Sequence, residues 1–286
     1  MSEAAVPRAA LSVWVMAARP RTLAASVAPV VVGTALAGAA APVAALLCLL
    51  SALFIQVGTN LANDYSDFKR GADAERVGPR RVTQSGLVAP AQVKRAAWIA
   101  FGLSGLIGLA LVAIAGWPII AIGVASVAAG WLYTGGPWPL GYHGLGDLFV
   151  FLFFGLVATC GTAYAQLLAI PPHAAVAGAA VGALATAILV VNNLRDRETD
   201  ARVGKNTLAV KIGRRWTRFE YCALLAFAFA LTPACGRPWP LLALPLAIAP
   251  LRRVLREEGA ALNPALGETA RLLLAFALLF AVELWP

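Results

Sequence analysis

Charged side chains are scarce in this sequence of 286 residues, because Asp, Glu, Lys and Arg together make up only 13% of it. Soluble globular chains carry about 25% charged residues. Hydrophobic residues make up 60%, and the mean hydropathy is +0.77. This composition excludes an ordinary soluble protein and indicates an integral membrane protein surrounded by the lipid bilayer. Apolar segments recur along the whole length, which predicts one polytopic domain over residues 1–286.

Cysteine and histidine are also rare, and neither is arranged as a metal site. The 4 cysteines are scattered without the spacing of metal ligands, so we expect them to be small packing residues. His143 and His173 stand alone in predicted loops. We expect no separate signal peptide at the N-terminus, since the apolar stretch 11–16 is short and no cleavage site follows it.

Long apolar windows dominate the rest of the chain. A transmembrane helix needs ~20 mainly apolar residues, and about nine windows meet that condition. The sequence therefore predicts an all-α membrane protein with about nine transmembrane helices. The windows are approximately 13–38, 43–64, 96–115, 117–134, 147–169, 174–194, 218–234, 238–254 and 267–285.

The basic residues give the predicted orientation. They concentrate in two segments, 69–95 and 195–218. If the N-terminus is cytoplasmic, the cytoplasmic segments hold 22 of the 23 Lys and Arg residues, as the positive-inside rule requires. We therefore expect a multi-pass protein of the cell membrane, with the C-terminus outside. The net charge of +9 comes from basic residues that gather on the predicted cytoplasmic side of the membrane. It therefore reflects the topology and does not indicate a nucleic-acid partner.

Aspartate is rare as well, yet its distribution is concentrated. The chain has six aspartates, and five of them fall in two short clusters, 63–73 and 192–200, at the predicted cytoplasmic ends of apolar windows. A carboxylate at the bilayer centre costs roughly 2.5–3.5 kcal/mol. Grouped acids also repel one another, which indicates that a positive species lies between them. A metal-bound anionic substrate is the first hypothesis.

The spacing within the clusters is helical. Asn192, Asp196 and Asp200 are four residues apart, so a helix would place all three along one face. Asn63 and Asp67 repeat the same step in the first cluster. Both pairs end an outward-to-inward window, which suggests a weak internal repeat.

Asp73 breaks this spacing, because it lies six residues beyond Asp67. A continuous helix would place its side chain well off the shared face. Gly71 lies between the two, and glycine readily ends a helix in the left-handed conformation. We expect the helix to end there, so that Asp73 turns back toward the site.

Magnesium is the metal that these side chains predict. Mg²⁺ prefers oxygen ligands and is usually held by one or two carboxylates together with substrate phosphates. We expect the Mg²⁺ ligands to be Asp67, Asp73, Asp196 and Asp200. Phosphate oxygens could accept charge-assisted hydrogen bonds from basic neighbours, namely Lys69, Arg70, Arg81, Arg195 and Lys205. For each basic residue singly, a solvated loop charge is an equally good interpretation.

These motifs resemble those of the UbiA superfamily of intramembrane prenyltransferases, which carry an Asn-rich first aspartate motif and an Asp-x3-Asp second one. The closer likeness is to the branch of 1,4-dihydroxy-2-naphthoate polyprenyltransferases (MenA). One departure is Gly71, where many relatives have a third acid; Asp73 follows two residues later. The matching segments are 18–23, 63–73, 78–81, 85–86, 133–137, 141–147, 192–200 and 204–209.

The resemblance implies a helical bundle around a central cavity, capped on the cytoplasmic side by the two motif-bearing loops. It implies an aromatic polyprenyltransferase in which Mg²⁺ binds the diphosphate of a polyprenyl diphosphate. Loss of diphosphate leaves an allylic cation, which the ring of 1,4-dihydroxy-2-naphthoate attacks with loss of its carboxylate. The product would be demethylmenaquinone, in menaquinone biosynthesis. Other acceptors, such as 4-hydroxybenzoate or homogentisate, use the same metal motifs and stay open.

Further residues carry two interpretations each. Asp64 is either a general base or a partner of Asn63. Tyr65 and Tyr133 either orient the aromatic substrate and shield the cation, or are interfacial aromatics. Arg19 either meets an anionic group or anchors the first helix. Asp147 follows Gly146, where a helix cap is the simplest interpretation.

The expected catalytic residues are Asp64, Asp67, Asp73, Asp196, Asp200 and Lys205, and the expected substrate-binding residues are Asn63, Asn192, Arg19, Tyr65, Lys69, Arg81, Tyr133 and Arg195.

A cation-coupled secondary transporter is the alternative from another class. Intramembrane acids often mark proton or cation pathways, and internal repeats are frequent in transporters. However, the acids here stand at the ends of windows and are mixed with many basic residues. That distribution favours an anionic substrate over a cation pathway.

Overall fold

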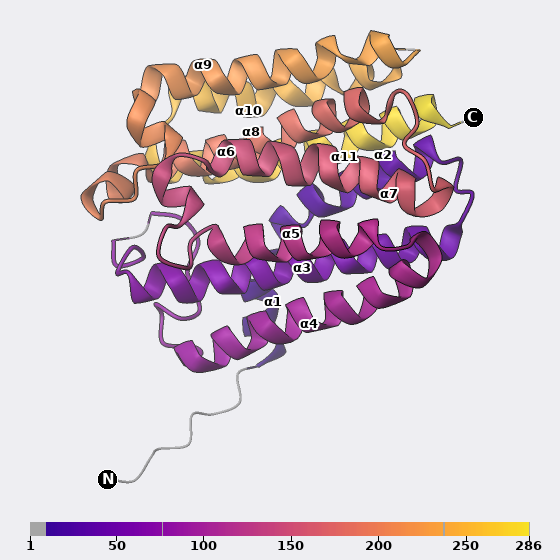
Figure 1. Cartoon of the computed structure of the whole chain (residues 1–286). Coiled ribbons are helices and arrows are strands. Elements are labelled where there is room, and N and C mark those ends of the chain that lie inside the picture. Colours follow the sequence, from indigo (N-terminus) through magenta and orange to yellow (C-terminus); the bar gives the residue numbers. More distant parts are fainter. Residues whose placement is uncertain (1–9, 76, 237, 286) are drawn as a thin grey trace.

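Figure 1 shows the computed structural model, which describes residues 10–75, 77–236 and 238–285. These residues contain helices and connecting loops and no β-strand, which confirms the all-α prediction. The main helices are α1 (Leu11–Ala18), α2 (Ala24–Leu36), α3 (Pro42–Lys69), α4 (Pro90–Ala115), α5 (Pro118–Leu132), α6 (Gly146–Val150), α7 (Ala158–Leu167), α8 (Ala174–Arg202), α9 (Leu208–Ala230), α10 (Leu244–Arg256) and α11 (Asn263–Leu284). The short elements are η1 (Pro20–Thr22), η2 (Leu140–His143), η3 (Phe151–Val157), η4 (Thr232–Cys235), η5 (Trp239–Ala243) and η6 (Gly259–Leu262).

Within the described residues, six helical segments are long and apolar enough to cross a membrane. They are Pro42–Lys69, Pro90–Ala115, Gly146–Leu167, Ala174–Arg202, Leu208–Cys235 and Gly259–Leu284. The pair Leu11–Thr22 and Ala24–Leu36, bent by 55°, makes a seventh if it counts as one span. A polytopic membrane protein is therefore confirmed. Nine spans stay a prediction, because α5 has 15 residues and α10 only 13.

The bend between α1 and α2 has a local cause. Pro20 disfavours helical backbone at the residue before it, and Arg19 adopts a left-handed φ of 54°. Asn60 on α3 stabilises the break: its Nδ2 donates to the Ala18 carbonyl at 2.9 Å and to Thr22 Oγ1 at 3.2 Å. The buried Asn60 side chain thus supplies hydrogen bonds at the break, where the regular backbone pairing of α1 has ended.

α8 forms the centre of the bundle, packed against α9, α11, α2 and the π-helix η3. In Figure 1, α3, α4 and α5 lie together on one side of the molecule, and α9, α10 and α11 lie on the other. Gly178 and Gly182 of α8 meet Gly155 of η3 at very short range. A Cβ added at Gly155 would lie 2.6 Å from the Gly182 Cα. Small residues four apart let helix backbones touch, which replaces the hydrophobic driving force that lipid removes.

α3 and α8 are longer than their predicted windows. They extend to Lys69 and Arg202, so both aspartate clusters begin on regular helix and not in loops. The two helix ends lie at the same end of the bundle, where Arg202 pairs with Glu75 at 3.2 Å. The fold therefore brings the two basic segments of the sequence together.

The α8–η3 contact predicts a large effect of a side chain at Gly182. A Cβ there would lie 2.7 Å from the Phe151 carbonyl oxygen and 3.0 Å from the Gly155 Cα. Gly182→Val should lower the free energy of unfolding by about 1–3 kcal/mol, as overpacking typically does. Denaturant titration in mixed micelles measures it. Gly102→Val is the control, since nothing lies within 4 Å of its added Cβ; equal stability of the two variants would contradict the close contact.

Candidate active site

Asp67, near the C-terminal end of α3, is the hub of the site, although it is only 1% exposed. Its Oδ2 lies 3.2 Å from Arg81 Nη2 and 3.5 Å from Lys205 Nζ. Its Oδ1 accepts a hydrogen bond of 2.9 Å from the Tyr142 hydroxyl. Three segments that are far apart in sequence thus converge on one buried carboxylate.

The expected break after α3 is confirmed. The helix ends at Lys69, and Gly71 follows with a left-handed φ of 69°. This turn brings Asp73 back into the interior, where it is 2% exposed and its Oδ1 lies 3.5 Å from Arg81 Nε. Arg81 therefore joins Asp67 to Asp73, two of the three acids of the first cluster.

Asp64 and Asn63 contact other parts of the structure. Both Asp64 oxygens accept backbone N–H groups, from Val82 at 3.1 Å and from Thr83 at 3.3 Å. Asn63 Oδ1 accepts from the Thr134 hydroxyl at 2.8 Å. Asp64 thereby fixes the loop that carries Arg81, and Asn63 fixes the loop after α5.

On α8, the second cluster is arranged around a buried guanidinium. Arg195 donates from Nε and Nη2 to the two oxygens of Asp196, at 2.8 and 2.5 Å. Its Nη2 also donates to Asn192 Oδ1 at 2.8 Å, and its Nη1 to Asn263 Oδ1 at 3.1 Å. Arg195 is thus bound to the side chains of the second motif. Asn263 was not predicted, since it follows about 70 residues later in a segment without a motif.

Lys205 connects the two clusters. Its Nζ lies 3.5 Å from Asp67 Oδ2 on α3 and 3.9 Å from Asp200 Oδ1 on α8. Both carboxylates are therefore within 4 Å of one nitrogen atom, close enough to share one bound ligand. The two acidic helix ends face each other, as the sequence predicts.

The buried carboxylates are suited to a divalent cation. Five aspartates of the two clusters are buried, and Arg81, Arg195 and Lys205 are among the cations paired with them. Carboxylate oxygens from two helices are the donors that Mg²⁺ prefers. The described residues contain no group of three His, Cys, Asp or Glu side chains that holds a metal alone. The donor type and the grouping of buried carboxylates fit Mg²⁺ if substrate phosphates complete the coordination.

Tyr142 is the main site residue that sequence reasoning missed. It lies in η2, is 8% exposed, and donates to Asp67. Arg70 and Lys205 lie over its ring, 5.3 and 5.4 Å from the centroid. Burial, and then the negative charge of Asp67, raise the pKa of Tyr142 well above its usual value, so the phenol stays a hydrogen-bond donor. Its signals were a place in the glycine-rich stretch 135–146 and in the matching segment 141–147, neither of which gave it a role in the site.

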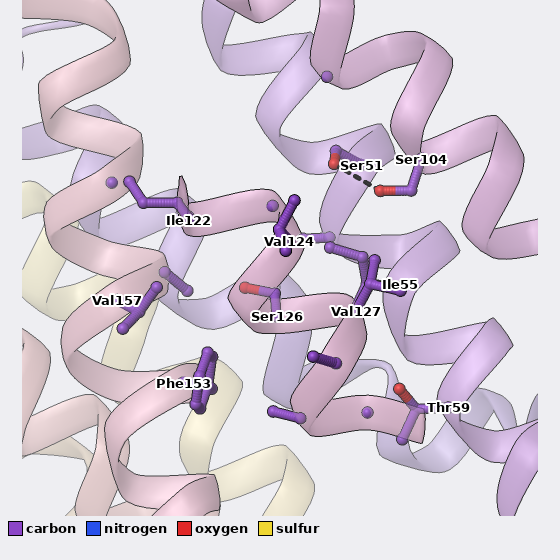
Figure 2. A pocket seen from close by; sticks show the side chains of 18 of the residues that line it. Ser51, Ile55, Thr59, Ser104, Ile122, Val124, Ser126, Val127, Phe153 and Val157 are labelled. Atoms are coloured by element: carbon purple, nitrogen blue, oxygen red, sulfur yellow. Dashed lines mark hydrogen bonds between the residues drawn. The ribbon is translucent and has the colours of Figure 1, made fainter. Parts of the chain in front are cut away.

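A cavity of about 700 Å³ lies between α3, α4, α5 and the η3–α7 segment. Its lining is mainly apolar and aromatic, with Trp131, Phe149 and Phe153 among the rings. Figure 2 shows a hydrogen bond of 2.8 Å between Ser51 and Ser104 across one wall. The cavity is suited to an apolar chain.

Tyr133 joins this cavity to the acidic site. Its side chain lines the cavity, and Gly141 and Gly146 pack so closely on its ring that an added Cβ would lie 3.2 Å from Cε1 or 2.7 Å from the hydroxyl. Tyr142, the next residue after Gly141, reaches Asp67. The apolar cavity and the acidic cluster are therefore adjacent.

Other predicted residues lie apart from the hub. Tyr65 packs beside Lys69 and Lys94, whose Nζ atoms lie 5.9 and 5.6 Å from its ring centroid. Lys69 itself is exposed, and Arg19 lies in the bend between α1 and α2. The cap prediction for Asp147 is wrong. α6 has no side-chain cap, because Asp147 is buried within its first turn and its Oδ2 has no described hydrogen-bond partner.

Comparison with known proteins decides the family. Residues 26–263 match the UbiA prenyltransferase family. The chain belongs to this family. The resemblance seen in the motifs is therefore confirmed, and the protein is an aromatic prenyltransferase by class.

Curated relatives and solved structures agree with this membership. A Mycobacterium tuberculosis protein named 1,4-dihydroxy-2-naphthoate octaprenyltransferase is 44% identical over 284 residues, covering 96% of this chain and 97% of its own. An Escherichia coli protein of the same name is 38% identical over 95% of this chain and 94% of its own. A UbiA homolog from Archaeoglobus fulgidus bound to GPP and Mg²⁺ has a TM-score of 0.62 and 16% identity, covering 94% of this chain and 99% of its own. The last likeness shows the fold.

The Tyr142–Asp67 hydrogen bond predicts a loss of prenyl transfer in Tyr142→Phe. A hydrogen bond to a charged group contributes about 1.5–3 kcal/mol, so turnover should fall at least about tenfold while the protein stays folded. Initial rates and the melting temperature of purified protein measure both effects. Tyr164→Phe is the matched control, because its hydroxyl donates to the Ala115 carbonyl away from the site. If both variants are equally active, Tyr142 does not position Asp67.

Proposed function

We propose that this protein transfers a polyprenyl group from polyprenyl diphosphate to 1,4-dihydroxy-2-naphthoate, with decarboxylation, to give demethylmenaquinol, the reduced form of demethylmenaquinone. The observation that carries the proposal is the contact of Lys205 with Asp67 and Asp200, next to an apolar cavity. An anionic head and an apolar tail are what these two neighbouring regions can bind. The full-length likeness to dihydroxynaphthoate octaprenyltransferases supports this acceptor.

Lys205 and Arg81 are the groups that would bind the diphosphate. Both already lie beside Asp67, so phosphate oxygens could replace a carboxylate as acceptors of their N–H groups. Asp67, Asp73, Asp196 and Asp200 would hold Mg²⁺, which neutralises the charge on the departing diphosphate. Asn63 would stabilise the loop after α5, and Asn192 would stabilise Arg195.

The apolar cavity would hold the prenyl chain next to the diphosphate. When the C–O bond to diphosphate breaks, both electrons leave with the oxygen and an allylic cation remains. Water would quench that cation, so the mainly apolar lining of the cavity is suited to excluding it. The aromatic faces of Tyr133 and Trp131, which line the cavity, can stabilise the positive charge.

The acceptor then completes the reaction. A ring carbon of the naphthoate supplies the electron pair for the new C–C bond, and the carboxylate leaves that carbon as CO₂. The electrons of the broken C–C bond return to the ring, so no base has to take a proton from that carbon. The reaction then does not need Asp64 as a general base for that carbon. This agrees with the structure, in which both Asp64 oxygens accept hydrogen bonds from a loop.

We also propose the finer topology: one domain of nine spans, with the N-terminus and the two motif-bearing loops on the cytoplasmic side and the C-terminus outside. The contact of Arg202 with Glu75 supports a common side for the basic loops. α5 and the segment 239–256 would complete the nine spans, together with the bent α1–α2 pair.

Product analysis tests the proposed reaction. Purified protein, Mg²⁺ and octaprenyl diphosphate are incubated with an equimolar mixture of 1,4-dihydroxy-2-naphthoate, 4-hydroxybenzoate and homogentisate. We expect one prenylated naphthoquinol lacking the carboxyl mass, no product with EDTA, and recovery with excess Mg²⁺. A main product from 4-hydroxybenzoate or homogentisate would replace the proposed acceptor, and full activity in EDTA would contradict the metal site.

The cavity wall predicts which residues determine chain length. Gly105 of α4 lines the cavity, and nothing lies within 4 Å of a Cβ added there. Gly105→Leu should therefore fill cavity space and lower kcat/KM for octaprenyl diphosphate about tenfold or more, while geranyl diphosphate is affected much less.

Gly102→Leu is the matched control on the same helix, because Gly102 is equally open but does not line the cavity. It should leave the ratio of the two substrates unchanged. Equal ratios for both variants would show that the chain lies elsewhere.

A further inference from the structure

A second groove lies away from the acidic site, between the start of α9 and the end of α10. It encloses about 550 Å³. Its six lining residues combine three guanidinium groups with an apolar floor: Arg214, Arg215, Arg218, Phe219, Cys222 and Leu255. Nothing in the proposed reaction uses this groove.

Two of its arginines already have hydrogen-bond or ion-pair partners within the fold. Arg218 donates from Nε to the Val254 carbonyl at 2.9 Å and from Nη2 to the Glu257 carbonyl at 3.1 Å, so it satisfies the last carbonyls of α10. Arg214 pairs with Glu198 at 3.0 Å and with Glu258. These contacts hold α9 against α10 and fix the shape of the groove.

Other arginines around the groove remain available. Arg215 lines it, is exposed, and has no ion pair or hydrogen bond among the described residues. Arg252 and Arg256, one turn apart on α10, do not line the groove but lie three residues before and one residue after its lining residue Leu255, and they likewise have no partner in the described part of the chain. The groove therefore has uncompensated positive charge, which is complementary to an anion.

The floor of the groove has the opposite character. Phe219 is 63% exposed and Leu255 is 45% exposed. Trp216, 60% exposed, packs edge-on against Phe219 with ring centroids 5.8 Å apart. Aromatic side chains at helix ends are typical of the membrane–water interface. A ligand here would have both an anionic head and an apolar body.

We propose that this groove binds the headgroup of an anionic phospholipid, with the phosphate between Arg215 and the arginines of α10 and an acyl chain on Phe219 and Leu255. Basic pockets between transmembrane helices bind such headgroups. A soluble anion would pair with the arginines but would not contact the exposed rings. The amphipathic lining therefore favours a lipid over free phosphate.

Lipid titration followed by native mass spectrometry tests the site. The purified protein is titrated separately with phosphatidylglycerol and with phosphatidylcholine, and the former titration is repeated with inorganic phosphate present. We expect one tight phosphatidylglycerol, weaker phosphatidylcholine, and no displacement by millimolar phosphate. The double variant R215Q/R252Q should bind phosphatidylglycerol about twenty-five-fold more weakly, since each arginine near the surface contributes about fivefold.

Arg95→Gln is the matched control, because Arg95 is an exposed arginine of α4 with no described partner, at the same end of the bundle. It should bind the lipid as the unmodified protein does. Unchanged binding in R215Q/R252Q, or an equal loss in R95Q, would overturn the site. Displacement by phosphate would overturn the lipid in favour of a soluble anion. Melting temperatures confirm that each variant is folded.

Discussion

Buried negative charge is the constraint on which this structure depends. The two acidic clusters are held at the ends of two long helices, where their five carboxylates are buried and Arg81, Arg195 and Lys205 are among the cations that contact them. Grouping buried carboxylates in this way is costly, because charges of one sign repel one another and buried charges need partners. Arg81 and Lys205 reduce the cost, and a divalent cation with an anionic substrate would remove it.

The neighbouring features follow from that constraint. Asp64 holds the loop that delivers Arg81, and Tyr142 stabilises the buried Asp67 carboxylate by donating to it. Tyr133 then connects the acidic cluster to the apolar cavity. The acidic cluster and the apolar cavity are thus separate but adjacent. A prenyl diphosphate, with an anionic head and an apolar chain, would need this arrangement.

Helical spacing and hydropathy predicted much of this arrangement. The four-residue steps placed the acids on helix faces, and Gly71 predicted the turn that returns Asp73 to the interior. The sequence could not predict Tyr142, because its contact depends on how the loop between α5 and α6 folds onto α3. Nor could it predict the Arg195–Asp196 pair, since adjacent residues on a helix ordinarily point to different faces. Asp147 was misassigned because a helix start does not show whether the side chain turns inward.

The central claim is that the two acidic helix ends bind one metal–diphosphate ligand together. The most direct test is an experimental structure of the protein with Mn²⁺ and an unreactive polyprenyl thiodiphosphate, with the metal located by anomalous scattering. The account predicts metal density that contacts Asp67 and at least one of Asp196 and Asp200, with Lys205 on the phosphates. Metal bound at one helix end alone, with the diphosphate outside the pair, would contradict it.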